Sequence, residues 1–145
     1  MLNVRLVAVG NIKESFFEDA IAEYVKRLGK YCKFEIIEIK ESDIKTEAAA
    51  IRQKLKGHVF LCDIKGALVT SNEFSDYFFN LGLMGTSTVT IVVGGSNGAG
   101  NYLDDVVNEK ISFGRITLPH QLFRVVLVEQ IYRAFTIIRG EKYHK

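Results

Sequence analysis

The stretch that decides the fold is the last third of the chain, residues 111–145, which reads ISFGRITLPHQLFRVVLVEQIYRAFTIIRGEKYHK. A short apolar run opens it and a long apolar run follows. Pro119 stands at the opening of the second run and Gly140 lies just beyond its end, an asymmetry typical of helices. The stretch therefore predicts a strand over 111–118 joined directly to a long helix over 120–139.

The apolar side chains of this helix cover most of its circumference. A helix that is apolar nearly all round is buried nearly all round. One face can pack on a sheet of the same chain. The other face predicts contact with a second copy, so we expect a twofold homodimer. The alternative is a helix that lies wholly inside its own monomer.

Strand and helix patterns alternate along the rest of the chain. This alternation predicts one α/β sandwich domain over residues 1–145, with a mainly parallel sheet of five or six strands and helices on both sides. Functional sites on such sheets lie beyond the carboxyl ends of the strands. The other β-type runs are 4–9, 34–39, 58–64 and 88–93, and the helical runs are 13–28, 48–55, 70–81 and 102–109.

Composition narrows the class of protein. Hydrophobic residues make up 48% and charged residues 25% of the chain, proportions ordinary for a soluble globular protein. No apolar run is long enough to span a membrane, and the start lacks the layout of a signal peptide, so we expect a cytoplasmic protein. Cys32 and Cys62 are then expected to be free thiols, and no Cys or His pair has the spacing of a metal site.

Positive charge is concentrated near the end of the chain. Residues 1–119 carry 14 Lys or Arg and 15 Asp or Glu, whereas residues 120–145 carry five and two. Basic residues favour the C-terminal ends of helices, and this alone accounts for a solvated helix end. The same distribution also suits an edge that faces the phosphates of a nucleic acid.

The run Gly94-Gly95-Ser96-Asn97-Gly98 follows the predicted strand 88–93. Gly95 and Gly100 have the spacing of a phosphate-binding P-loop, but Asn101 stands where that loop requires Lys. Without that lysine the loop lacks the charge that phosphates need, which excludes this interpretation. A plain glycine turn between strand and helix remains possible.

A second interpretation of the same glycines is the nucleophile elbow of a serine hydrolase, G-x-S-x-G. Ser96 would be the nucleophile, and Asp104 or Asp105 and then His120 follow in the order of such hydrolases. The aspartates lie only eight or nine residues beyond Ser96, so they are poorly placed to orient His120. The chain is also short for that fold.

Polar residues gather where the last strand meets the last helix. His120, Gln121 and Arg124 form a polar cluster at the mouth of an otherwise apolar element, which packing alone does not explain. Gly114, inside the predicted strand, permits a close approach to the backbone. We therefore expect the site where this joint meets the glycine run.

With these residues in view, the sequence resembles the RlmH family of SPOUT-class methyltransferases. Members methylate N3 of a pseudouridine in helix 69 of bacterial 23S rRNA. The resemblance covers nearly the whole chain. It rests on LVAVG near the start, EYVKRLGKY at 23–31, VVGGSNG at 92–98, ITLPHQLFRVVLVEQIYRAF at 116–135 and the ending RGEKYHK.

The resemblance implies a fold that the pattern does not predict. The C-terminal part would thread a loop to form a trefoil knot, a feature that is nearly absent from other proteins. It also implies a homodimer, a 23S rRNA substrate within the ribosome, and a bound S-adenosylmethionine held by the backbone of three loops. The positions that match the family's cofactor contacts are Cys62, Gly94, Phe113, Gly114, Arg115, Ile116, Thr117 and Leu118.

The resemblance further implies that the basic tail lies near the active site. His120, Arg124, Tyr143 and His144 are the candidates for catalysis, by positioning the nucleotide or by easing loss of its proton, and no base is assigned.

The segment 42–56 is shorter than is usual in the family. The expected function is an rRNA methyltransferase. The alternatives are a non-catalytic, knotted RNA- or ribosome-binding protein and a serine hydrolase. The phosphate contacts would come from Arg124, Arg133, Arg139, Lys142 and Lys145.

Overall fold

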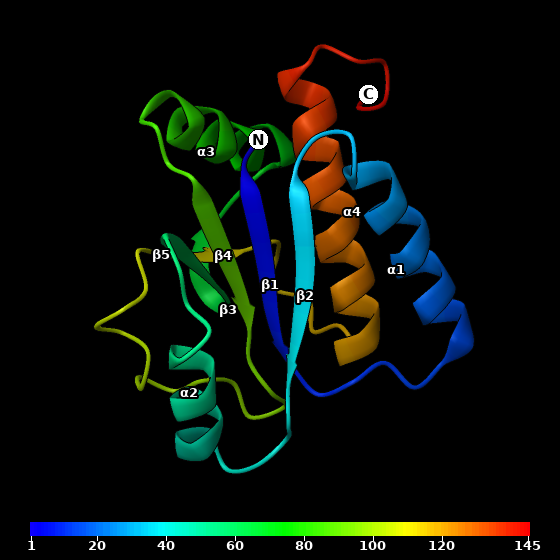
Figure 1. Ribbon diagram of the computed structural model, residues 1–145. Helices are drawn as coiled ribbons and strands as arrows, with labels where there is room; N and C mark the ends of the chain where they lie inside the picture. Colours follow the sequence, from blue (N-terminus) through cyan, green and yellow to red (C-terminus); the bar gives the residue numbers. More distant parts are fainter.

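The computed structural model describes all 145 residues, which form one five-stranded sheet with helices on both faces (Figure 1). The strand order is β2-β1-β4-β3-β5, and every neighbouring pair is parallel. The predicted α/β sandwich with a parallel sheet is confirmed. The strands are β1 (Asn3–Val9), β2 (Lys33–Ile39), β3 (His58–Leu68), β4 (Thr88–Val93) and β5 (Glu109–Ser112), and the helices are α1 (Ser15–Leu28), α2 (Ile44–Arg52), α3 (Ser71–Leu83) and α4 (His120–Ile138).

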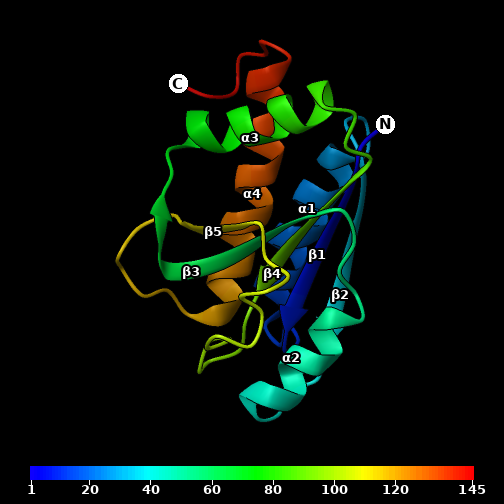
Figure 2. The same cartoon turned by 90° about the vertical axis from the view of Figure 1, so that its left-hand side faces the viewer.

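Two apolar cores fill the space on either side of the sheet. Helices α1, α3 and α4 cover one face, and α2 covers the other face near the carboxyl ends of the strands (Figures 1 and 2). Every residue of β4 is buried, as its β-branched run predicts for a central strand. No helix is long and apolar enough to cross a membrane.

Capping hydrogen bonds mark the starts of two helices, and α2 covers 44–52 where the sequence predicted 48–55. The side chain of Asp43 accepts from the backbone N–H of Thr46 at the start of α2. At the start of α3, Thr70 and Glu73 form a reciprocal capping box. Each such cap satisfies backbone donors that the first helical turn leaves free.

Helix α4 runs as predicted, from His120 just after Pro119 to Ile138 just before Gly140. Gly140 has a φ of +68°, a conformation that suits glycine after a helix. The face that packs on the sheet, α1 and α3 is buried. The opposite face, which includes Leu122, Val125 and Val126, is only partly covered within one chain.

Two predictions about the C-terminal third are wrong. No helix forms over 102–109: residues 102–106 form turns and Glu109 begins β5. The only fully buried side chain there is Leu103, and Asp104 and Asp105 pair with Lys110 and Arg52. The last strand ends at Ser112 and does not extend to Leu118. Gly114, at a φ of +153°, takes the chain out of the sheet, and residues 113–119 form a loop.

Candidate active site

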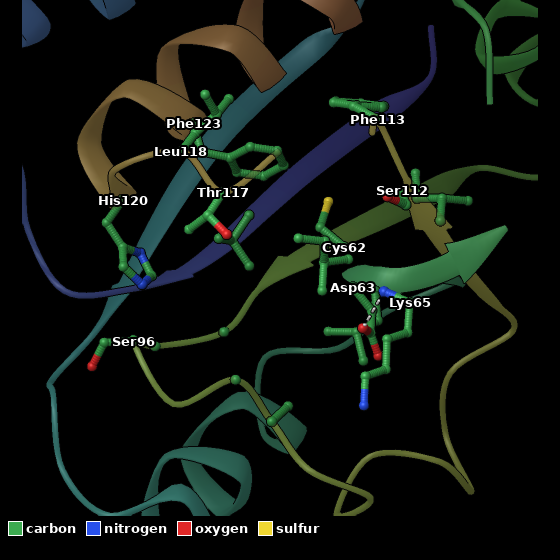
Figure 3. Close-up of a pocket in the computed structure, with 18 of the residues that line it drawn as sticks. Cys62, Asp63, Lys65, Ser96, Ser112, Phe113, Thr117, Leu118, His120 and Phe123 are labelled. Atoms are coloured by element: carbon green, nitrogen blue, oxygen red, sulfur yellow. Dashed lines mark hydrogen bonds between the residues drawn. The ribbon is translucent and has the colours of Figure 1, made fainter. Parts of the chain in front are cut away.

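A cavity of about 840 Å³ lies beyond the carboxyl ends of β3, β4 and β5 (Figure 3). Its walls come from the end of β3, from the glycine loop after β4, and from the loop between β5 and α4. The structure brings all eight of the predicted cofactor-binding residues into its lining, together with His120. The eight are Cys62, Gly94, Phe113, Gly114, Arg115, Ile116, Thr117 and Leu118.

One wall of the cavity is an irregularity in β3. Both Cys62 and Ala67 pair with Ile111 of β5, so the residues between them bulge out of the sheet. A Cβ atom at Gly66 would lie 2.8–2.9 Å from the backbone of Lys110 and Ile111. Backbone atoms cannot move aside cheaply, so only glycine allows this bulge to sit against β5.

The bulge is closed by its own polar groups and by the loop that faces it. The carboxylate of Asp63 accepts from the backbone N–H of Lys65 at 2.9 Å. The guanidinium of Arg115 donates to the carbonyl of Ile64, and to the carbonyl of Gly66 at 3.1 Å. Arg115 thereby joins the loop 113–119 to the end of β3, and two walls of the cavity form one unit.

The glycine loop folds back on itself. The N–H of Gly98 donates to the carbonyl of Gly95 at 2.9 Å, and a Cβ at Gly94 would lie 3.1 Å from the carbonyl carbon of Gly98. A Cβ at Gly95 would lie 2.9 Å from a carboxylate oxygen of Glu47. Gly94 and Gly95 therefore permit close approach of the chain to itself.

The cavity carries little charge. Asp63 is the only carboxylate in the lining, and Lys65 and Arg115 are the cations. Burial raises the pKa of the Cys62 thiol to about 12, so this thiol is neutral at physiological pH. A neutral thiol is a poor nucleophile, and Cys62 serves the cavity as a wall. No group of His, Cys, Asp and Glu side chains is arranged to hold a metal ion.

Of the four predicted catalytic residues, only His120 lines the cavity. Arg124 is only 5% exposed, does not line the cavity and reaches towards β2. It pairs with Glu38 of β2 at 2.5 Å and donates to the carbonyl of Gly10 at 3.0 Å. The structure does place polar side chains together at the start of α4. Within one chain, however, Arg124 joins α4 to β2 and to the segment after β1.

Gln121 also connects the start of α4 to the segment between β1 and α1. Its side-chain oxygen accepts from the backbone N–H groups of Lys13 and Glu14, at 2.8 and 3.1 Å. These two N–H groups lie at the start of α1, which has no side-chain cap of its own. The first turn of α4 is thus fixed to the β1–α1 segment, and this fixes where the loop 113–119 ends.

The C-terminal tail, which holds Tyr143 and His144, follows the end of α4 that lies away from His120 (Figures 1 and 2). The Tyr143 hydroxyl donates to Glu129 at 2.7 Å, and Arg133 lies 3.0 Å from Nδ1 of His144. Burial, with the Glu129 bond as the next cause, raises the pKa of Tyr143. Since α4 has 19 residues, its two ends are separated by about 28 Å. The tail folds back along α4 as far as Glu129 and Arg133, and neither Tyr143 nor His144 lines the cavity of its own chain.

The geometry excludes a serine hydrolase. No non-glycine residue has a positive φ, so Ser96 does not occupy the strained turn of a nucleophile elbow. Asp104 pairs with Lys110 at 2.6 Å, and Asp105 pairs with Arg52. No aspartate therefore orients His120, and no hydrogen bond joins His120 to Ser96.

Comparison with known proteins shows the family of the chain. A family model described as "Predicted SPOUT methyltransferase" matches residues 2–144. The chain belongs to the SPOUT methyltransferase family. It is therefore a methyltransferase.

The relatives of this SPOUT methyltransferase include two clostridial proteins called "Ribosomal RNA large subunit methyltransferase H". The protein from Clostridium beijerinckii is 42% identical and that from Clostridium botulinum (strain Okra) 45% identical, each over 99% of this chain and 100% of the relative. Both alignments span 159 positions, more than the 145 residues here, so the relatives carry insertions that this chain lacks. A solved A. aeolicus TrmH/SpoU tRNA modifying enzyme aligns over 94% of this chain and 77% of that chain, with 11% identity and a TM-score of 0.46.

Proposed function

We propose that this methyltransferase transfers the methyl group of S-adenosylmethionine to N3 of a pseudouridine in helix 69 of 23S rRNA, within cytoplasmic ribosomes. The observation that carries the proposal is the cavity, which gathers all eight residues that match the family's cofactor contacts. The relatives with "Ribosomal RNA large subunit methyltransferase H" as their name support the choice of RNA, because they align with the whole chain.

The residues of the cavity fit S-adenosylmethionine. A volume of about 840 Å³ is within the range of small-molecule sites. A Cβ at Gly114 would meet no protein atom within 4 Å, so its backbone faces open space. Cys62, Gly94 and residues 113–118 would hold the cofactor through backbone groups. Asp63, as the only carboxylate, is suited to a cationic or hydroxyl group of the cofactor. We also propose that these loops form the trefoil knot.

The protein has few chemical tasks in this reaction, because the cofactor supplies a methyl group that is already activated. The chain must align the nucleotide for in-line attack and ease the loss of the imide proton. His120 is the one imidazole at the cavity, and we assign it the positioning of the nucleotide there. The neutral Cys62 does not compete for the methyl group, since a thiolate would be a better nucleophile.

A second copy of the chain completes the site. Neither Tyr143 nor His144 lines the cavity of its own chain. The Tyr143 hydroxyl bonds to Glu129, nine residues beyond His120, so it lies about 14 Å along α4 from the cavity end of the helix. We assign both residues to the cavity of a partner. The half-covered face of α4, with Leu122, Val125 and Val126, supplies an apolar surface for this homodimer.

Mixed dimers test this arrangement. Thr117→Trp, at an exposed lining position, should fill the cavity, and removal of residues 142–145 should disable the tail. Each variant alone should be inactive. Their mixture should recover about a quarter of wild-type activity, because half of randomly paired dimers carry one complete site. No recovery in dimers shown by mass spectrometry to be mixed would contradict a site shared between copies.

Two measurements test the proposed activity. Calorimetry on the purified protein should show binding of S-adenosylmethionine, and its absence would rule out the proposal. Mass mapping of rRNA from cells that lack the gene should show one missing methyl group on a pseudouridine, restored by the wild-type gene. Ser96→Ala should restore it equally well. Complete rRNA methylation in the deletion strain would also overturn the proposal.

A further inference from the structure

Positive charge is concentrated at one end of the molecule. Residues 23–33 and 129–145, which we call the basic–aromatic end, hold eight Lys or Arg and three Asp or Glu, a net charge of +5 in a chain of net charge +2. The end of α1, the start of β2 and the tail meet there, at the opposite end of the sheet from the cavity (Figure 1). The cations are Lys26, Arg27, Lys30, Lys33, Arg133, Arg139, Lys142 and Lys145.

Aromatic rings lie among these cations. Every cation–π contact of the chain is found at the basic–aromatic end. The Arg139 guanidinium lies 4.9 Å and the Lys30 ammonium 5.1 Å from the centre of the Tyr31 ring. The Arg133 guanidinium lies 4.8 Å from the ring of Tyr143. Such contacts hold the cations in fixed positions on a rigid surface.

The cations of the basic–aromatic end differ in whether a carboxylate of the same chain pairs with them. Arg133 is bound to Glu129 at 2.8 Å and shapes the tail. Lys26 and Lys33 are exposed and take part in no ion pair, and Lys30 is 4.0 Å from its nearest carboxylate, on Glu141. The three lysines lie outside the tail, yet the fold places them beside it. They are therefore available to a partner that carries negative charge.

We propose that the basic–aromatic end binds the phosphate backbone of RNA, and that Lys26, Lys30 and Lys33 extend this surface from the tail onto α1 and β2. The inference rests on the proposed rRNA methylation. Ordered cations on a rigid surface, with aromatic side chains between them, match phosphates and unstacked bases. Because this end is remote from the cavity of its own chain, it holds RNA for the cavity of the second copy.

A matched pair of triple variants tests the proposal. Lys26→Gln, Lys30→Gln and Lys33→Gln together remove the extension of the surface onto α1 and β2 and change no residue of the tail or the cavity. Three other exposed lysines without ion pairs lie at the carboxyl end of the sheet and provide the control, which changes charge equally. The control triple is Lys13→Gln, Lys40→Gln and Lys45→Gln, which follow the carboxyl ends of β1 and β2.

The probes are a labelled RNA stem-loop, titrated at several salt concentrations, and ribosomes from the deletion strain. For the first triple, RNA affinity should fall about tenfold, and the slope of log K against log salt should decrease by about two. The KM for ribosomes should rise with kcat within about twofold, and the Kd for S-adenosylmethionine should stay unchanged. The control triple should change none of these by more than about twofold.

Three results would overturn the inference while the proposed activity stands. In the first result, the first triple binds RNA with wild-type affinity. In the second, the control triple loses as much RNA affinity as the first triple. In the third, the first triple loses affinity for polyaspartate and keeps its affinity for RNA. The last result would assign the surface to an acidic protein. Failure of the proposed activity would look different, since the wild-type protein would then bind no S-adenosylmethionine and methylate no ribosomes.

Discussion

The two ends of α4 are built in different ways. At its start, the cavity is lined by glycine-rich loops and apolar side chains, with a single carboxylate. At its end, the tail is held by side chains, with Tyr143 and Arg133 both bonded to Glu129. Backbone groups suit a small cofactor whose shape is constant, whereas charged and aromatic side chains suit a large polyanion. We infer that the cofactor is recognised at the start of α4 and the RNA at its end.

Because the two ends are built differently, we expect them to respond differently to substitution. The cavity end should tolerate changes of side-chain chemistry but not added volume where backbones meet. The tail end should tolerate changes of volume but not the loss of charge. Three substitutions at the cavity end examine this comparison, from the largest expected effect to the smallest.

Gly66→Ala should have the largest effect. Its Cβ would lie 2.8–2.9 Å from the backbone of β5, so β3 and β5 must separate at the cavity wall. We expect a loss of about 2–3 kcal/mol in the free energy of unfolding and loss of S-adenosylmethionine binding. Gly82→Ala in α3 is the control, because its Cβ meets nothing within 4 Å. It should stabilise the protein by about 0.5–1 kcal/mol. Denaturant titration and calorimetry measure both.

Arg124→Gln should have an intermediate effect. It removes the pair with Glu38 and the bond to Gly10, and since Glu38 is 44% exposed we expect a loss of about 2 kcal/mol, with cofactor binding within about threefold. Thermal unfolding and calorimetry check this. Unchanged stability together with lost methyl transfer would show instead that Arg124 acts in catalysis, as its place in the sequence suggests.

Cys62→Leu should have the smallest effect. If Cys62 contributes only backbone and a neutral wall, cofactor affinity should stay within about twofold. In the wild-type protein, the raised pKa of about 12 means that the thiolate is scarce at pH 8. Iodoacetamide should therefore alkylate Cys62 about a thousandfold more slowly than an ordinary thiol. Rapid alkylation of Cys62 at pH 8 in the folded protein would contradict the conclusion that this thiol is neutral and unreactive.

The pKa of Cys62 also sets a pH dependence of stability. Because the folded state raises this pKa, its contribution to stability is complete below the unfolded thiol's pKa, near 9, and is lost as pH rises towards 12. The free energy of unfolding should fall over this range, and Cys62→Leu should make the fall shallower. Buried Cys32, whose pKa is also raised to about 12, accounts for a further part of it.

Much of the cavity could be predicted from the sequence because its parts are local. The glycine loop follows a strand directly, and residues 113–118 precede a helix with clear end signals. Gly66 and Asp63 were missed because the need for them is long-range. The bulge that they form is visible only once β3 lies beside β5, where Gly66 meets Ile111 across 45 positions of sequence.

The errors share a cause. The polar residues at the start of α4 were recognised, but the partner of Arg124 is Glu38, 86 positions away, and no local pattern reveals that pair. The segment 102–109 resembles a short helix, yet Asp104 and Asp105 bond to Lys110 and Arg52 and hold it as turns. Tertiary bonds override local preference at such places.

The most direct test of the account is removal of residues 142–145, which leaves Glu141 in place to accept from the Tyr31 hydroxyl at 2.6 Å. The truncated protein should fold and bind S-adenosylmethionine with unchanged affinity, since its cavity lies at the other end of α4. Methyl transfer to ribosomes from the deletion strain should fall more than about a hundredfold, because we propose that the tail completes the partner's site. Normal methylation by the truncated protein would contradict the account.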